Sequence, residues 1–367
     1  MSEIKKLIER LCPDGVEYKK LGEVCEIKTG KLNANAQVEN GLYPFYTCDA
    51  KPFRIDTYAF DTEAIIISGN GSQVGHINYY KGKFNAYQRT YILDNFEIVN
   101  IFFVLHYLRG TIRPYIIKKS KKGSVPYITL PMLSNFELPV PPIEVQSKIV
   151  EILDNFTELE AELEAELEAR KKQYEYYRNQ LLTFDKDKGA RFDVKWMKLG
   201  EVCQIMNGKD YKNYPSGNIP VYGTGGIMTY INTYAYDKPS VLLPRKGSID
   251  KTYYVDEPFW TVDTIYWTKI NDEVVIPKYM HYYLKTVNLS AMNTGTGAIP
   301  SLTQAVLKKI SLPIPPLSEQ QRIVSILDRF EALTTDLQSG LPAEIEARRK
   351  QYEYYREQLL TFKRKTA

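Results

Sequence analysis

The sequence predicts an α+β protein in which two globular, β-rich domains alternate with two long helices. The segment at 169–184 (ARKKQYEYYRNQLLTF) returns at 347–362 with fourteen of sixteen residues identical. The segment at 138–156 returns at 312–330 with eleven of nineteen identical. The inserts between these repeats differ almost completely, and both contain short strand-like runs with glycine turns. We therefore expect an internal pseudo-two-fold repeat.

Length and charge set broad limits on the protein. A chain of 367 residues is long enough for two or three domains. The segment 151–169 holds eight acids and no base, and removing its charge of −8 from the net +4 leaves +12 on the rest of the chain. This excess favours a polyanionic partner such as nucleic acid, although many basic proteins bind none.

The same composition gives no membrane or secretion signal. No run approaches the roughly 18 apolar residues of a membrane helix. The first eleven residues resemble an amphipathic helix rather than a signal peptide. We expect a cytoplasmic protein without a membrane partner.

Motifs for catalysis and for metals are scarce. Cys25 and Cys203 hold equivalent places in the repeat and no CxxC pair exists, so we expect small buried thiols. His76, His106 and His281 show no metal-ligand spacing. The P-loop, HExxH and GxSxG motifs are missing as well. We predict no metal and no cofactor on this chain.

Each repeat is predicted to begin with a strand, at 21–31 (LGEVCEIKTGK) and 199–209 (LGEVCQIMNGK). After the insert, three prolines at 139, 141 and 142, repeated at 313, 315 and 316, exclude helix and favour an extended segment. A helix of about Glu144 to Phe184 should follow the first, and one of about Ser318 to Gln338 the second. Gly340 and Pro342 predict a break before another helix begins.

Apolar residues spaced three and four apart along both helices indicate a coiled-coil seam. Each stripe needs a partner, so we expect the two helices to pack antiparallel, with one insert near each end. The candidate seam residues are Ile152, Phe156, Leu159, Leu163, Tyr174, Tyr177, Leu181, Ile326, Phe330, Leu333, Tyr352, Tyr355 and Leu359.

A smaller repeat lies within the first helix, where ELEA occurs three times over 158–169. Each unit would lengthen the helix by roughly 6 Å and rotate it by about 40°. The segment fits a spacer of adjustable length, and it also fits an ordinary solvated acidic helix.

Each insert offers strands, one helix and a glycine-rich loop. We expect strands at 64–68, 74–80 and 87–93 in the first insert, with a turn at 81–83, and at 240–243, 252–255 and 261–268 in the second. The helices should span 98–108 and 277–287.

Polar and basic loops of the inserts are candidates for nucleic-acid contact. Lysines beside a flexible glycine can follow a phosphate backbone, and amide or guanidinium groups can contact base edges. A solvated surface loop or a plain hairpin turn would explain the same residues. The candidates are Asn70, Ser72, Gln73, Arg89, Lys118, Lys119, Lys121, Lys122, Lys209, Arg245, Lys246, Ser248, Lys251, Thr294 and Thr296.

Taken together, the chain resembles the specificity subunit of type I restriction-modification systems. The resemblance rests on the LGEVC segments, the LPxPPxxxQxxIVxILD segments, the QYEYYRxQLLTF helix ends, the duplication and the ELEA repeat. It implies two target-recognition domains and two helical regions packed antiparallel, with each domain reading half of a bipartite site in double-stranded DNA. In this family the tetrapeptide repeat count is associated with the gap between half-sites.

The resemblance also implies partners and a division of labour. The subunit itself would be non-catalytic, and would recruit two methylation (M) subunits and restriction (R) subunits. S-adenosylmethionine, ATP and Mg are expected only on those partners. The expected boundaries are 1–141 for the N-terminal segment and first recognition domain, 142–184 for the central helix, 185–315 for the second recognition domain and 316–367 for the C-terminal helical region.

Two other readings remain open from the residues. A coiled-coil scaffold that binds only proteins would show no salt-dependent DNA binding. A stand-alone nuclease or methyltransferase would act on DNA without other subunits.

Overall fold

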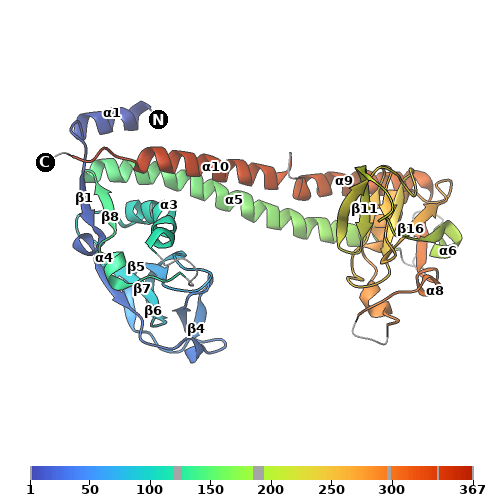
Figure 1. Cartoon of the computed structure of the whole chain (residues 1–367), viewed down its shortest axis with the longest axis horizontal. Helices are drawn as coiled ribbons and strands as arrows, with labels where there is room; N and C mark the ends of the chain where they lie inside the picture. The colour runs from blue at the N-terminus through green and yellow to red at the C-terminus, as the bar shows by residue number, and fades with distance from the viewer. Residues whose placement is uncertain (1, 120–125, 185–193, 296–298, 337–338, 366–367) are drawn as a thin grey trace. The chain divides into compact units, whose positions relative to one another are not determined.

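The computed structural model describes residues 2–119, 126–184, 194–295, 299–336 and 339–365, and it contains two compact units (Figure 1). Unit 1 comprises Met1–Glu164 and Glu344–Ala367, and unit 2 comprises Ala165–Ala343. Helix α5 (Ile143–Leu182) is continuous and contributes residues to both. The long helices α5, α9 (Leu317–Thr335) and α10 (Leu341–Leu360) are here called the frame helices. Each unit therefore combines one β-rich domain with parts of the frame helices.

The elements of unit 1, besides its part of α5, are α1 (Ser2–Leu11), β1 (Glu17–Lys20), α2 (Leu21–Val24), β2 (Glu26–Thr29), η1 (Ala34–Ala36), β3 (Tyr43–Tyr46), β4 (Phe53–Ile55), β5 (Phe60–Ser68), β6 (Ile77–Ala86), β7 (Thr90–Asp94), α3 (Ile101–Lys119), α4 (Leu130–Ser134), β8 (Glu137–Val140) and most of α10 (Leu341–Leu360).

A mixed sheet with the order β2-β7-β5-β6-β3-β4 forms the body of unit 1. Neighbouring strands are antiparallel except β3 and β6, which are parallel. Ile65 and Ile67 of β5 pack with α3 on one face, whereas Ala64 and Ile66 pack on the other. Because both faces are covered, β5 reads as a continuous apolar run rather than an alternating one.

The elements of unit 2, besides its part of α5, are β9 (Lys195–Lys198), α6 (Leu199–Val202), β10 (Cys203–Asn207), β11 (Ser216–Gly223), β12 (Gly226–Ile231), β13 (Ser240–Pro244), β14 (Tyr253–Val255), β15 (Trp260–Thr261), β16 (Ile265–Ile270), α7 (Pro277–Leu284), η2 (Leu289–Met292), α8 (Gln304–Leu307), β17 (Ser311–Ile314) and α9 (Leu317–Thr335).

Unit 2 repeats this topology in two pieces. One sheet has the order β10-β16-β13-β14, matching β2-β7-β5-β6 of unit 1, and a second has the order β12-β11-β15. The long β6 of unit 1 corresponds to both β14 and β15: β14 pairs with β13, and β15 pairs in parallel with β11, as the end of β6 does with β3. The divergent inserts thus share one strand arrangement.

A buried glutamine attaches each domain to its frame. In unit 1, Gln146 of α5 accepts a hydrogen bond from the backbone N–H of Asn100 (2.7 Å) and donates one to the carbonyl of Pro141 (2.7 Å). In unit 2, Gln320 of α9 likewise accepts from the N–H of Ile276 (2.8 Å) and donates to the carbonyl of Pro315 (2.9 Å). These bonds explain why the glutamine of the LPxPPxxxQ segment recurs: it joins the start of the frame helix to the start of α3 or α7.

Helix pairs form within each unit, as the seam pattern predicts. In unit 1, Phe156 of α5 stacks on Tyr355 of α10 with ring centroids 5.1 Å apart, and Glu160 pairs with Arg349 at 2.7 Å. Residue numbers rise along α5 as they fall along α10, so this pair is antiparallel. In unit 2, Tyr177 of α5 stacks on Phe330 of α9 at 5.6 Å. The packing is looser than a buried seam, since Tyr177 and Leu333 each remain 38% exposed.

The predicted break in the second frame helix is confirmed. Helix α9 ends at Thr335 and α10 begins at Leu341. The backbone folds tightly at Gly340, where a Cβ would lie 2.6 Å from the carbonyl oxygen of Ala332. Only glycine fits this approach without a shift of the backbone.

Five element predictions are wrong. Residues 21–24 and 199–202 are helical turns instead of strands, because Glu23 and Glu201 fold back to accept from the N–H groups of Lys20 and Lys198. Gly82 does not make a turn; with φ +128° it continues β6 opposite Thr62.

The other two errors concern an element's length and its continuity. Helix α3 runs past Gly110, whose missing Cβ leaves room for Arg356. The predicted strand at 261–268 is divided between β15 and β16.

Candidate nucleic-acid interface

The candidate loops of unit 1 gather at one edge of its sheet, here called edge 1. There β2 ends, β5 ends and β7 begins, since Thr29 lies opposite Tyr91 and Ser68 opposite Thr90. The N–H of Gly69 donates to the carbonyl of Arg89 (2.9 Å). Edge 1 comprises the loops at 30–31, 47–52, 69–76 and 87–89 and the segment 127–128.

Hydrogen bonds fix the loop at 69–76 within edge 1. Its Gly69 carbonyl accepts from the N–H of Ile128 (2.8 Å), and Asn70 forms an isolated bridge with Tyr127. On the other side, His76 Nε2 lies 3.1 Å from the carbonyl oxygen of Ala50. Ser72 and Gln73 are exposed between these anchors. The backbone is therefore held while those two side chains face solvent, as direct contact with a ligand requires.

The basic candidates of unit 1 lie near this loop where the structure describes them. Lys118 and Lys119 end α3, one turn beyond Arg113 and Ile116, which flank Gly75 of the loop. Arg89 is exposed beside Gly69. Lys121 and Lys122 lie outside the described residues.

The candidate loops of unit 2 gather at the equivalent edge, here called edge 2. The N–H of Arg245 donates to the carbonyl of Thr264 (3.0 Å), and the N–H of Gly247 donates to that of Pro300 (3.0 Å). The N–H of Lys209 donates to the carbonyl of Thr261 (2.8 Å). Edge 2 comprises the loops at 208–209, 223–228, 245–251 and 261–264 and the described residues of 293–302.

The side chains of edge 2 differ in how firmly they are held. Arg245 donates from Nη1 to the carbonyl of Asp263 (2.9 Å), and its guanidinium lies 5.8 Å from the ring centroid of Tyr266. Its remaining N–H groups leave it able to donate outward. Thr294 bonds the carbonyl of Ser301 through both its N–H and its hydroxyl.

The other candidates of edge 2 face solvent. Exposed positions are held by Lys209, Lys246, Ser248, Lys251 and Thr294, whereas Arg245 is half-buried. Thr296 lies outside the described residues. At edge 2 the structure therefore places together candidates from three loops that are distant in the chain.

One component of each edge was missed from the sequence. The tip of hairpin β3–β4 (47–52) reaches edge 1, and the tip of hairpin β11–β12 (223–228) reaches edge 2. In unit 2 the signal was Gly223-Thr224-Gly225-Gly226 between two β-branched runs, a hairpin pattern. Unit 1 has no comparable glycine signal at its tip, TCDAKP.

Glycines allow close approach within the two edges. A Cβ at Gly30 would lie 2.0 Å from the carbonyl oxygen of Ala86, and one at Gly208 would lie 2.0 Å from that of Val262. These matched contacts place Lys31 and Lys209 at equivalent positions, although only Lys209 was a candidate.

Among the described residues, the two buried cysteine thiols have a structural role. Cys25 and Cys203 are buried and donate to the carbonyls of Leu21 and Leu199 at 3.3 Å each; burial raises the pKa of both thiols to about 12. Among the described residues, no group of three or more acidic, histidine or cysteine side chains could hold a metal ion. None of the described helices is both long and apolar enough to cross a membrane.

Comparisons with known proteins identify the family and the fold. The family model for the type I restriction modification DNA specificity domain matches residues 13–169 and 193–347. A putative type I restriction enzyme specificity subunit of Haemophilus influenzae is 34% identical over 99% of this chain and 100% of its own length. A putative type I specificity subunit of Mycoplasma pneumoniae is 30% identical over 82% of this chain and 94% of its own.

A solved structure shares the fold. The crystal structure of the S subunit of a type I restriction-modification system from M. genitalium aligns with a TM-score of 0.65 over 94% of this chain and 96% of its own, at 16% identity. Two copies of the family domain and a relative matched along its whole length establish that this chain belongs to the type I restriction-modification specificity subunits.

Proposed function

We propose that this chain is the non-catalytic DNA-reading subunit of a cytoplasmic type I restriction-modification enzyme. It reads a bipartite, asymmetric site in double-stranded DNA, with one half contacted by edge 1 and the other by edge 2. The observation that carries the proposal is that both edges form at the same strand ends but present different side chains. Edge 1 offers Asn70, Ser72 and Gln73, whereas edge 2 offers Arg245, Lys246 and Ser248.

The chemistry of the edges suits two tasks. Amide and guanidinium groups make paired hydrogen bonds with adenine or guanine edges. Lysines such as Lys119 and Lys246 instead neutralise phosphates, which adds affinity without sequence preference. Different readers on a common frame should give two unrelated half-sites.

We assign partner recruitment to the repeated helix segments at 169–184 and 347–362. Tyr176 and Tyr354 occupy equivalent positions and are 58% and 59% exposed, so burial in this chain does not account for their presence. Each packs edge-on against the next tyrosine, Tyr177 or Tyr355, with centroids 5.5 and 5.3 Å apart. Two equal exposed aromatic surfaces fit two copies of one partner, the methylation subunit; restriction subunits would join that assembly. S-adenosylmethionine, ATP and Mg would be bound by these partners.

The test is selection of bound duplexes from a random pool by the chain assembled with its partners. We expect two short motifs separated by a fixed gap. Gln73→Ala should relax preference within one motif and Lys246→Ala should weaken all sequences similarly, since a phosphate contact carries no base preference. Both variants exchange one exposed loop residue, so each controls for the other.

Several outcomes would contradict the proposal. Assembly without sequence-specific DNA binding would leave only the protein-binding scaffold. DNA cleavage or methylation by the pure chain would contradict its non-catalytic role. Fewer than two methylation subunits in the purified assembly would contradict the recruitment scheme.

A further inference from the structure

An exposed methionine lies at the tip of hairpin β11–β12, within edge 2. Met228 is 57% exposed, although it sits on a strand whose other end, Ile231, is buried. It is also the extra residue of a β-bulge, since Val221 lies opposite Thr229 while Tyr222 lies opposite Ile227. Bulges commonly re-aim a side chain near functional sites.

Several contacts place Met228 beside the candidate readers. A Cβ at Gly223 would lie 2.6 Å from Met228 Sδ and 3.5 Å from Thr264 Oγ1. The carbonyl of Thr264 in turn accepts the N–H groups of Arg245 (3.0 Å) and Lys246 (3.1 Å). Met228 therefore lies against the backbone of Gly223, next to the loop that carries Arg245 and Lys246.

The tip of hairpin β11–β12 is anchored at Thr224 and open to solvent at Gly225. Tyr253 donates from Oη to the carbonyl of Thr224 (2.9 Å), and a Cβ at Gly247 would lie 3.5 Å from Thr224 Oγ1. At Gly225, in contrast, a Cβ would meet no atom within 4 Å. A ligand can therefore approach a tip that is anchored on one side and open on the other.

From this placement we propose that Met228 reads a thymine 5-methyl group in the half-site bound by edge 2. This inference rests on the proposed function. The thymine methyl is the one apolar group that base pairs present in the major groove. A flexible thioether chain beside guanidinium and ammonium groups suits contact with that methyl while its neighbours bind polar atoms.

The equivalent tip of unit 1 makes this property specific to one half-site. Hairpin β3–β4 carries Asp49 and Lys51 at its tip, and both are exposed. The tip has no long, flexible apolar side chain comparable with Met228. The half-site bound by edge 1 should therefore lack this form of thymine reading.

Uracil provides the test, because it pairs as thymine does and lacks only the methyl. Once Gln73→Ala has identified the motif of edge 1, each thymine of the other motif is replaced by uracil in turn. For the wild-type assembly we expect one such position to weaken binding about fourfold, the size of one buried methyl.

The variants locate the contact. Met228→Ala should bind the thymine and uracil duplexes equally, whereas Met228→Leu should keep the preference for thymine. Uracil in the motif of edge 1 is the internal control, and there the wild type and Met228→Ala should respond alike.

Other results would overturn the inference while leaving the proposed function standing. These are a motif of edge 2 without thymine on either strand, no effect of uracil at any position, or an equal uracil effect in wild type and Met228→Ala. If the wild-type assembly shows no sequence preference at all, the proposed function is refuted instead.

Discussion

The two units attach a recognition domain to the frame at equivalent positions but with different chemistry. The N–H of Asn100 donates to Gln146 as the N–H of Ile276 donates to Gln320. This match aligns α3 with α7 and makes His106 the counterpart of Tyr282. In unit 1 the contact is a buried chain of neutral groups beside one carboxylate. In unit 2 it is a half-exposed network of ion pairs.

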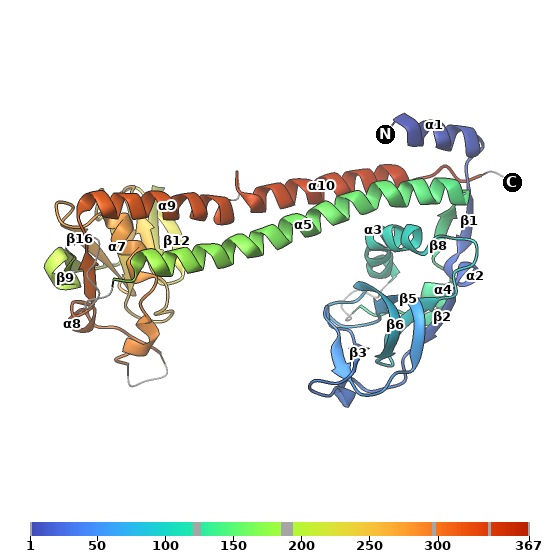
Figure 2. The ribbon, with the colours of Figure 1, turned by 180° about the vertical axis from the view of Figure 1, so that it is seen from behind.

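The contact in unit 1 centres on His106, which is 1% exposed. Its Nε2 lies 2.8 Å from Asp154 Oδ1 of α5, and its Nδ1 lies 2.8 Å from Tyr352 Oη of α10. Figure 2 shows α3, which carries His106, lying beneath α5. An ionised carboxylate only accepts, so Nε2–H donates to Asp154 and Nδ1 accepts from Tyr352. Burial lowers the pKa of His106, against the opposing effect of Asp154, so the ring is neutral at pH 7.

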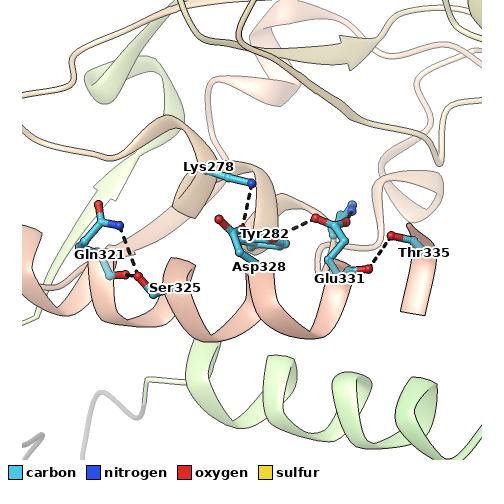
Figure 3. Close-up of polar contacts among 8 residues, drawn as sticks. Lys278, Tyr282, Gln321, Ser325, Asp328, Glu331 and Thr335 are labelled. Atoms are coloured by element: carbon cyan, nitrogen blue, oxygen red, sulfur yellow. Dashed lines mark hydrogen bonds and ion pairs between the residues drawn. The ribbon is translucent and has the colours of Figure 1, made fainter. Parts of the chain in front are cut away.

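Figure 3 shows the counterpart in unit 2, where α7 reaches α9. Tyr282 Oη lies 2.6 Å from Asp328 Oδ1 and 2.8 Å from Glu331 Oε2. Lys278 pairs with Asp328 at 3.0 Å and Lys285 with Glu331 at 2.9 Å. Meanwhile Tyr174, the counterpart of Tyr352, has a buried hydroxyl with no hydrogen-bond partner among the described residues. The comparison teaches that the backbone attachment is kept while the side chains that reinforce it can change.

The largest expected difference between the units is their response to acid. Burial lowers the pKa of His281 in unit 2 to about 3, and Nδ1 of that ring has no described partner. The unfolded chain would bind this proton near pH 6.5, so stability falls as the pH drops from about 6.5 towards 3, by as much as ~5 kcal/mol. We expect His281→Leu, which installs the counterpart residue Leu105, to remove most of this loss.

Urea unfolding at several pH values, followed by hydrogen-exchange pulses at one fixed pH, measures each unit separately. Unit 2 of the His281→Leu variant should still lose some stability in acid, because Glu331 also contributes. Burial, the largest single influence, acts to raise the pKa of Glu331, but Lys285, Tyr282 and His281 together lower it below its ordinary value. An acid loss in unit 2 unchanged by His281→Leu would show that this histidine is not its source.

The sequence predicted the frame well and the attachment poorly, for a physical reason. Helical periodicity, the proline segments and the Gly340 break are local signals, and they located α5, α9 and α10 within a few residues. The contact of His106 with Asp154 and Tyr352 joins residues that are distant in sequence, so no spacing rule indicates it. The hairpin tip at 47–52 was missed for the related reason that its partner strands are short and lack a glycine turn.

A second difference concerns removal of the central side chain in unit 1. His106→Ala should destabilise unit 1 by about 3 kcal/mol, because it opens a cavity and leaves the Tyr352 hydroxyl without its acceptor. Tyr352→Phe is the matched control: it removes one hydroxyl without a cavity and should cost about 1 kcal/mol.

The same unit-resolved unfolding experiment reports both variants. Unit 2 should keep its stability in each, because the contact lies within unit 1. If His106→Ala costs no more than Tyr352→Phe, the histidine does not organise the contact.

The smallest effect is expected from Tyr282→Phe in unit 2. The hydroxyl has one proton for two carboxylates, and both acids keep a lysine when it is lost. The predicted cost is about 1 kcal/mol, well below that of His106→Ala, because half-exposed ion pairs remain and no cavity forms. Unfolding of unit 2 at low and high salt tests this, since the remaining ion pairs should weaken with salt whereas the contact of unit 1 should not. A cost as large as that of His106→Ala would mean that Tyr282 is as central to unit 2 as the histidine is to unit 1, and the contrast between the two attachments would fail.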